Sequence, residues 1–154
     1  MIKQIYVDTS VIGGYFDAEF KKSTRLFFDR ILEQKIEIVV SEILELELYK
    51  APEHIIDFYE SIPNEIINKI ELTSEARDLA EKYILEKVVG KTSRADCQHI
   101  AMATISRVSV LASWNFKHIV NLEKIRGYNA INFREGYPMI EIRTPKEIFG
   151  DESN

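Results

Sequence analysis

Short apolar runs alternate with longer segments of helical periodicity along almost the whole chain, and this alternation strongly constrains the fold. We expect buried strands at residues 4–8, 37–40, 69–72, 108–112 and 139–142, with a further short strand near 130–133. Helices are expected at about 18–34, 42–50, 53–60, 74–88, 94–107 and 117–125. Strands that alternate with helices require right-handed crossovers. The sequence therefore predicts an α/β fold, with a central, mostly parallel sheet of about five strands between two layers of helices.

The composition is that of a single globular domain. The 154 residues are 45% hydrophobic and 29% charged, which is enough for one domain over 1–154, with residues 146–154 a possible loose tail. No apolar run approaches the roughly 20 residues that span a bilayer, so we expect no membrane partner. Because the first predicted strand begins close to residue 1, we expect no secretory leader, and the single cysteine, Cys97, fits a reducing cytoplasm.

Two short polar side chains directly follow predicted strands. Asp8 ends the first apolar run, and Asn115 lies just beyond the strand at 108–112. Either residue is explained equally simply as a helix cap or a turn residue. For Asp8 we favour a functional role, because Thr9 or Ser10 could provide the cap. Ligands of parallel α/β sheets bind at the carboxyl ends of the strands, which makes both positions candidates for a binding site.

Two further acids lie on predicted helices. At about 100° per residue, Glu47 falls on the apolar side of the helix at 42–50, so we expect it to point inward and to need a partner. A buried arginine or an edge position is the alternative explanation. Asp96 follows Ser93 in a Ser-x-x-Asp capping pattern, so a cap at the positive end of a helix explains it as well as a functional role does.

Acids in buried positions are costly unless a positive group lies among them, and a divalent metal is the simplest such group. Carboxylate and amide oxygens suit a hard cation, Mg²⁺ or Mn²⁺. Metal and carboxylates in an open α/β sheet indicate phosphodiester hydrolysis. The candidate metal-binding and catalytic residues are Asp8, Glu47, Asp96 and Asn115.

Other features weigh less or point elsewhere. His99 shares a helix face with Asp96 and is expected either to pack or to border the site. No Cys/His spacing typical of zinc is present, and no glycine-rich phosphate loop. The net charge of −5, from 20 basic and 25 acidic residues, is unusual for a nucleic-acid enzyme, although an acidic metal site itself contributes to it.

In order and context, these residues resemble the PIN-domain ribonucleases, in particular the toxin-like members of VapC type. The matching segments are Tyr-Val-Asp-Thr-Ser-Val-Ile (6–12), Val-Val-Ser-Glu-Ile-Leu-Glu-Leu-Glu-Leu (39–48), Ala-Asp-Cys-Gln-His-Ile-Ala-Met-Ala (95–103) and Leu-Ala-Ser-Trp-Asn-Phe (111–116). In that family a serine precedes the glutamate by six residues, which selects Ser41 and Glu47. The fourth family position is usually Asp, whereas Asn115 stands here, and the lost charge should weaken metal binding.

The resemblance implies a Mg²⁺- or Mn²⁺-dependent endoribonuclease that cleaves single-stranded or structured RNA through a metal-activated water. It also implies the toxin of a toxin–antitoxin pair, with a homodimer and a small antitoxin protein as partners. Candidate substrate-binding residues are Thr9, Ser113, Arg94 and Lys117. Tyr15 and Phe16 could stack on a base or belong to the core. The alternative is a catalytically weak or inactive PIN-like module that binds RNA or protein, which Asn115 and the acidic balance favour.

Overall fold

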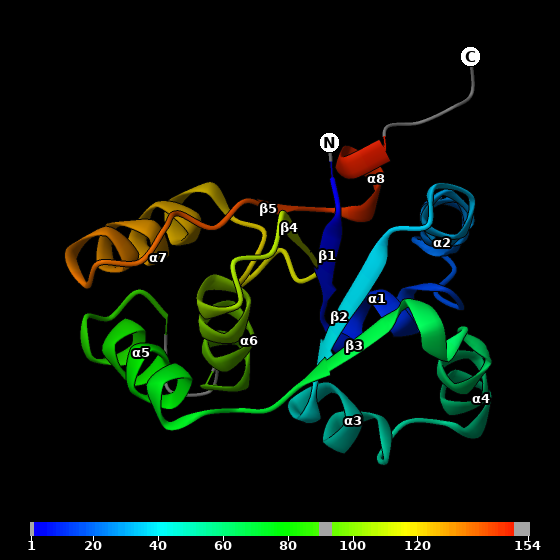
Figure 1. Ribbon diagram of the computed structural model, residues 1–154, viewed down its shortest axis with the longest axis horizontal. Coiled ribbons are helices and arrows are strands. Elements are labelled where there is room, and N and C mark those ends of the chain that lie inside the picture. The colour runs from blue at the N-terminus through cyan, green and yellow to red at the C-terminus, as the bar shows by residue number, and fades with distance from the viewer. Residues whose placement is uncertain (1, 90–93, 150–154) are drawn as a thin grey trace.

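The computed structural model describes residues 2–89 and 94–149, and its centre is one sheet of five strands (Figure 1). All four strand pairings are parallel, as predicted, and the spatial order is β3-β2-β1-β4-β5. The strands are β1 (Gln4–Val7), β2 (Glu37–Ser41), β3 (Ile67–Ile70), β4 (Val110–Ala112) and β5 (Ile142–Arg143).

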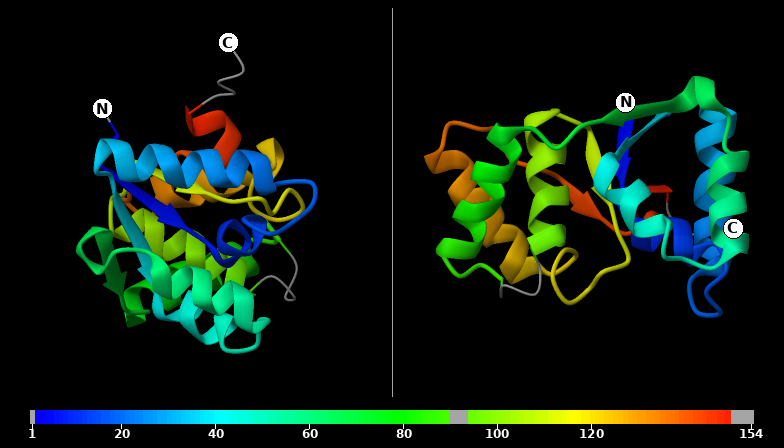
Figure 2. Two further views of the ribbon diagram at one scale, coloured as in Figure 1. Left: turned by 90° about the vertical axis from the view of Figure 1, so that its right-hand side faces the viewer. Right: turned by 90° about the horizontal axis from the view of Figure 1, so that it is seen from below.

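Helices cover both faces of the sheet, as Figures 1 and 2 show. On one face lie α1 (Thr9–Gly14), α2 (Lys21–Gln34) and α4 (Glu53–Ser61), which is followed by a 3₁₀ turn, Asn64–Ile66. On the other face lie α5 (Ser74–Leu85), α6 (Arg94–Ile105) and α7 (Leu122–Arg134). The short α3 (Glu42–Leu48) follows β2 at the lower edge of Figure 1, and α8 (Pro145–Phe149) packs beside α2.

The sheet separates two apolar cores. Successive side chains of a strand point to opposite faces, so Ile5 and Val7 pack with Phe27 of α2, whereas Tyr6 packs with Ile100 of α6. Because both faces are covered, the strands read as nearly continuous apolar runs in the sequence. Those runs are the signal from which the parallel sheet was predicted.

Several local predictions were wrong. Residues 130–133 belong to α7 and not to a strand: Ile131 and Asn132 are buried and Phe133 is exposed, which is a helical pattern. α7 begins at Leu122 and not near 117, because Asn121 caps it by accepting a hydrogen bond from the backbone N of Lys124 at 3.2 Å. Helix α1 was not among the predicted helices, and β3 lies two residues earlier than expected.

The end of the described chain is packed. Ile148 and Phe149 of α8 contact the core on the α2 side, so this part of the expected loose tail is a docked helix. Residues 150–154, the rest of that tail, lie outside the described residues. Among the described helices, none is both long and apolar enough to cross a membrane.

The strand order places a topological switch point between β1 and β4. From β1 the chain passes through α1 and α2 to β2, which lies on one side of β1. Strand β4 lies on the other side of β1, and the chain reaches it from β3 through α5 and α6 on the opposite face of the sheet. Parallel sheets bind ligands at this kind of switch point, outside the carboxyl ends of the strands. Asp8 follows β1 and Ser113 follows β4, so both lie at this switch point.

Candidate functional site at the carboxyl edge of the sheet

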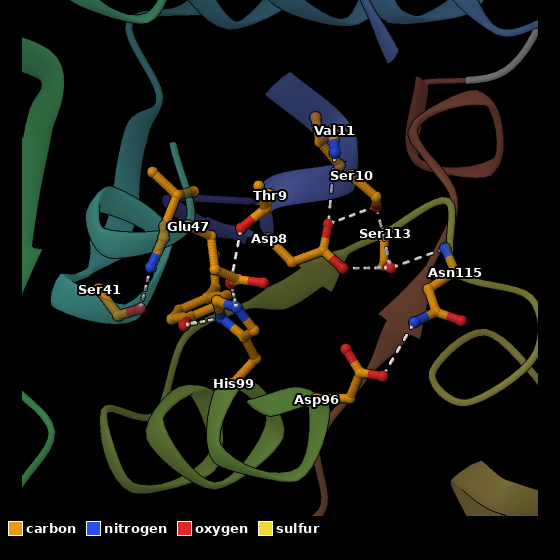
Figure 3. A network of polar contacts seen from close by, with 12 residues as sticks. Asp8, Thr9, Ser10, Val11, Ser41, Glu47, Asp96, His99, Ser113 and Asn115 are labelled. Atoms are coloured by element: carbon orange, nitrogen blue, oxygen red, sulfur yellow. Dashed lines mark hydrogen bonds and ion pairs between the residues drawn. The ribbon is translucent and has the colours of Figure 1, made fainter. Parts of the chain in front are cut away.

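Asp8 lies at the switch point, directly after β1, and has two roles (Figure 3). It is the N-cap of α1, where its Oδ1 accepts a hydrogen bond from the backbone N of Val11 at 3.3 Å. Ser10 Oγ donates to the same oxygen at 2.6 Å, and Ser113 Oγ donates to Oδ2 at 2.5 Å. Burial raises the pKa of the Asp8 carboxyl above its ordinary value in spite of these hydrogen bonds. Asp8 is therefore a cap that also carries an incompletely compensated buried charge.

The side chains of Asp96 and Asn115 face each other and are in direct contact (Figure 3). Asp96 lies in the first turn of α6, and Asn115 Nδ2 donates a hydrogen bond to its Oδ2 at 3.1 Å. Asn115 Oδ1 accepts from the backbone N of His118 at 3.0 Å, so Asn115 also has the capping role that its sequence suggested. Burial and then the negative charge of Asp8 raise the pKa of Asp96. The cap expected from Ser93 lies outside the described residues.

Glu47 lies at the rim of the site, not inside it. The expectation that it points inward was wrong, because its side chain is 41% exposed. Helix α3 begins at the end of the sheet, capped by Ser41, and turns Leu44 and Leu48 toward the core. Partial burial raises the pKa of Glu47, but the hydrogen bond and the electrostatic attraction of His99, and then the hydrogen bond from Thr9, more than offset this effect, so the pKa is lowered.

His99 is the residue of this site that sequence reasoning undervalued. Its side chain is 2% exposed, and its Nε2 lies 2.9 Å from Glu47 Oε1. Its Nδ1 lies 2.6 Å from the hydroxyl of Tyr6. The signal was its spacing of three residues from Asp96, which places both on one face of α6. Ser10 was weighed only as a possible cap, although the Asp-Thr-Ser motif places its hydroxyl on Asp8.

The candidate substrate-binding residues fall into two groups. The hydroxyl of Thr9 donates a hydrogen bond to Glu47 at 2.8 Å, and that of Ser113 donates one to Asp8 at 2.5 Å. These two residues therefore hold acids of the site. Arg94 pairs with Glu81 at 2.9 Å. Lys117 is exposed in the turn after Asn115.

The aromatic side chains near the site differ in how far they are packed against other rings. Tyr15 stacks on Phe58 with ring centroids 3.8 Å apart, and Phe16 contacts Phe58 as well, so both pack against α4. Trp114 lies between Ser113 and Asn115 and stacks on Phe20 at 4.3 Å. The neighbouring Phe116 is 50% exposed, which makes it the more accessible aromatic ring beside the site.

The chemistry of these residues fits a hard divalent cation. Two carboxyls with raised pKa values lie close enough to repel each other, and a cation would relieve that repulsion. The buried Nδ1 of His118 has no hydrogen-bond partner within the described part of the chain, and this ring acts on Asp96 electrostatically. No three His, Cys, Asp or Glu side chains among the described residues are gathered closely enough to hold an ion as they stand. A cation at this site would therefore take only part of its oxygen ligands from these side chains and keep several waters, as Mg²⁺ usually does.

Fold and site define an α/β domain with acidic side chains gathered at the switch point of an open parallel sheet. The family model described as "PIN domain" matches residues 5–116, which is most of the chain. The chain therefore belongs to the PIN domain family, as its motifs predicted.

Three solved structures with this fold are toxins or toxin–antitoxin complexes. VapBC2 from Rickettsia felis, bound to a promoter DNA fragment, is 14% identical with a TM-score of 0.57, covering 92% of this chain and 98% of its own. VapC20 from Mycobacterium tuberculosis, a sarcin–ricin loop cleaving toxin, is 12% identical with a TM-score of 0.56, covering 89% and 98%. DNA-bound VapBC from Salmonella typhimurium is 19% identical with a TM-score of 0.57, covering 94% and 99%. No curated protein sequence matches the chain significantly.

Proposed function

We propose that this protein is a Mg²⁺- or Mn²⁺-dependent endoribonuclease that cleaves single-stranded or looped RNA. The observation that carries the proposal is the pair of acids at the switch point: the pKa of Asp8 is raised by burial, and that of Asp96 by burial and by Asp8. Such a pair destabilises the metal-free site and favours a cation there. Membership of the PIN domain family supports the same assignment.

Each acid has a separate role in this proposal. Asp8 is held on both oxygens by Ser10 and Ser113, so it provides a fixed carboxylate at the base of the site. Asp96 and Glu47 approach from α6 and α3 and complete the oxygen ligands together with Asn115. The ion, when bound, lowers the pKa of a coordinated water and polarises the scissile phosphate. Hydrolysis of this kind needs no protein nucleophile, and the buried Cys97, whose thiol pKa burial raises to about 12, would be a poor one.

Substrate contacts are expected beside the loop that follows β4. Phe116 is half exposed next to Asn115 and can stack on an unpaired base. Lys117 follows it and is exposed, so it can contact a phosphate near that base. These two residues would bind RNA locally although the protein as a whole carries a net charge of −5.

The biological role that we propose is that of the toxin in a toxin–antitoxin pair. Two of the structures with this fold are VapBC complexes and a third is a VapC toxin that cleaves the sarcin–ricin loop. By analogy, we propose a homodimer with a small antitoxin protein as its partner, acting in the cytoplasm. The identity of the antitoxin follows from co-purification with the product of a neighbouring small open reading frame.

The test is cleavage of a mixed-sequence single-stranded RNA in Mn²⁺, Mg²⁺ or EDTA. Wild-type protein is compared with Asp8→Asn and Asp96→Asn, and circular dichroism checks that all three are folded. Cleavage that depends on metal and is lost in both variants supports the nuclease. If folded wild-type protein binds Mn²⁺ but cuts no RNA, the endoribonuclease proposal is wrong.

The second candidate is a PIN-like module that binds RNA or protein without cleaving it. The observation in its favour is the amide of Asn115, which donates a hydrogen bond to Asp96 and partly compensates its charge without a metal. Restoring an acid with Asn115→Asp distinguishes the two candidates. If only this variant cleaves RNA in the assay above, the natural protein is the binding module.

A further inference from the structure

The His99 imidazole connects the middle of the sheet to the rim of the site (Figure 3). One ring nitrogen contacts the hydroxyl of Tyr6 at 2.6 Å, and the other contacts Glu47 Oε1 at 2.9 Å. The ring itself is 2% exposed, whereas the Glu47 side chain is 41% exposed. The buried imidazole of His99, which makes a hydrogen bond through each ring nitrogen, therefore holds Glu47, the most exposed of the three acids of the site.

Tyr6 is a rigid anchor for this ring. It is fully buried at the middle of β1, where it pairs with Val39 of β2 and Leu111 of β4. Its ring also meets the imidazole edge-on, with centroids 5.7 Å apart and an interplanar angle of 72°. If the imidazole rotated away, the buried Tyr6 hydroxyl would lose one of its two side-chain partners and keep only Ser41, which is unfavourable. The position of His99 is therefore fixed by the sheet.

The contact with Glu47 does not depend on the charge of the ring. A carboxylate can only accept hydrogen bonds, so the Nε2 that faces Glu47 carries a hydrogen whether the ring is neutral or protonated. The Tyr6 hydroxyl adapts, because it can donate to Nδ1 or accept from it. The three groups thus form one chain, from Tyr6 through His99 to Glu47, in either protonation state.

Glu47 is held on one oxygen only. The hydrogen bonds from Thr9 and His99 both end on Oε1, at 2.8 Å and 2.9 Å. Among the described residues, nothing donates a hydrogen bond to Oε2, which leaves that oxygen available to a cation. Asp8 differs, because it is hydrogen-bonded on both oxygens.

We propose that His99 is a positioning residue, which fixes Glu47 so that one carboxylate oxygen is presented to the metal. This inference rests on the proposed function, because it assumes that Glu47 ligates a cation. Three rotatable bonds otherwise give a half-exposed glutamate many conformations, and ordering them on metal binding would reduce affinity. Tyr6 acts one step further back, by fixing the ring.

The test is a titration of metal-stripped protein with Mn²⁺, in which electron paramagnetic resonance measures the free ion. Loss of a group that orients a ligand typically costs 10–100-fold in metal affinity, so we expect His99→Leu to raise the Kd about tenfold or more. His99→Gln retains an N–H donor near the position of Nε2 and is expected to bind Mn²⁺ more tightly than His99→Leu. This difference distinguishes the effect of the hydrogen bond to Glu47 from the effect of filling the same volume with an apolar side chain.

A matched pair of tyrosines provides the control. Tyr83 is as deeply buried as Tyr6, and its hydroxyl donates to Asn132 Oδ1 at 2.5 Å, between α5 and α7. Tyr6→Phe and Tyr83→Phe each remove one buried hydroxyl, and urea unfolding in EDTA compares the stability that each loses. Only Tyr6→Phe is expected to weaken Mn²⁺ binding. If both variants change the Kd equally, the role of the chain is structural and the proposal is wrong.

The coupling to Glu47 is the decisive measurement. Because His99 acts through Glu47, His99→Leu should cause no further loss of Mn²⁺ affinity in a Glu47→Ala background. Asp8→Asn reports on the metal site itself. If Asp8→Asn weakens binding but folded His99→Leu and Tyr6→Phe bind as wild type does, the positioning role is refuted and the metal site stands. If Asp8→Asn leaves Mn²⁺ binding unchanged, the proposed function fails and this inference fails with it.

Discussion

Replacing Asn115 by Asp should have opposite effects on the metal-free and the metal-loaded protein. The amide of Asn115 donates to Asp96 Oδ2 at 3.1 Å, so the substitution exchanges a hydrogen bond for two facing carboxylates. Asn115 Oδ1 also accepts from the backbone N of His118, and an aspartate oxygen can keep that contact. The two side chains have nearly the same shape, so the perturbation is almost purely electrostatic.

The size of the effect follows from two terms. A hydrogen bond to a charged group contributes about 1.5–3 kcal/mol, and two unit charges about 4 Å apart repel by about 4 kcal/mol at an effective dielectric constant of about 20. The repulsion cannot destabilise the protein by more than about 4 kcal/mol, because at that cost one of the two carboxyls takes up a proton at pH 7 and loses its charge. Asp96 and Asn115 are both partly exposed, so water and salt screen part of the repulsion. We expect the free energy of unfolding in EDTA to fall by about 2–4 kcal/mol.

Urea unfolding at pH 7 measures this loss, first in EDTA and then in excess Mn²⁺. An ion that relieves the new repulsion needs only about 1.4 kcal/mol of it to bind tenfold more tightly. The variant should therefore gain more stability from Mn²⁺ than wild type does. Its Kd for Mn²⁺ should be at least about tenfold lower than that of wild type. Asn115→Ala is the control, because it removes the same hydrogen bond without adding a charge. It also removes the contact with the backbone N of His118, so it should lose about 2–4 kcal/mol, and it should gain no affinity.

Two results would refute the reasoning. If Asn115→Asp is as stable as wild type in EDTA, its side chain does not face Asp96 in solution. If the variant is destabilised but binds Mn²⁺ no more tightly, position 115 lies outside the metal site.

Three further predictions concern the pH dependence, the packing and the substrate surface. Burial raises the pKa of Asp8, so the folded metal-free protein binds this proton more tightly than the unfolded chain. Its stability should fall as pH rises from the ordinary carboxyl pKa of about 4 through the raised value, and urea unfolding in EDTA should show a smaller fall for Asp8→Asn. A Cβ at Gly14 would lie 2.8 Å from the Trp114 ring, whereas one at Gly13 would meet nothing within 4 Å. We expect Gly14→Ala to lose about 1–3 kcal/mol in urea unfolding and Gly13→Ala to lose nothing; equal losses would contradict this packing. Phe116→Ala should weaken binding of single-stranded RNA by about 1–3 kcal/mol in fluorescence anisotropy and leave Mn²⁺ affinity unchanged. Unchanged RNA binding would exclude Phe116 from the substrate surface.

The sequence determined the architecture and the position of two site residues. Parallel strands covered on both faces must be apolar along their length, so the runs around Tyr6 and Leu111 identified buried strands directly. Since the carboxyl ends of parallel strands lie at one edge of the sheet, Asp8 and Asn115 could be placed at that edge from the sequence alone. Local patterns failed where they were ambiguous: Ile131 and its neighbours are apolar enough for a strand, but they form the buried side of α7.

Only the tertiary structure decided how the site residues meet. Helical periodicity placed Glu47 on an apolar face, yet α3 lies at the end of the sheet and leaves this side chain at the rim. The partners of His99 are Tyr6, 93 positions away, and Glu47, 52 positions away, and no local pattern encodes such contacts. Periodicity states which side of an element is buried, whereas the crossovers of the chain decide which element it faces. For this reason the sequence could predict the acids, and only the fold shows what holds them.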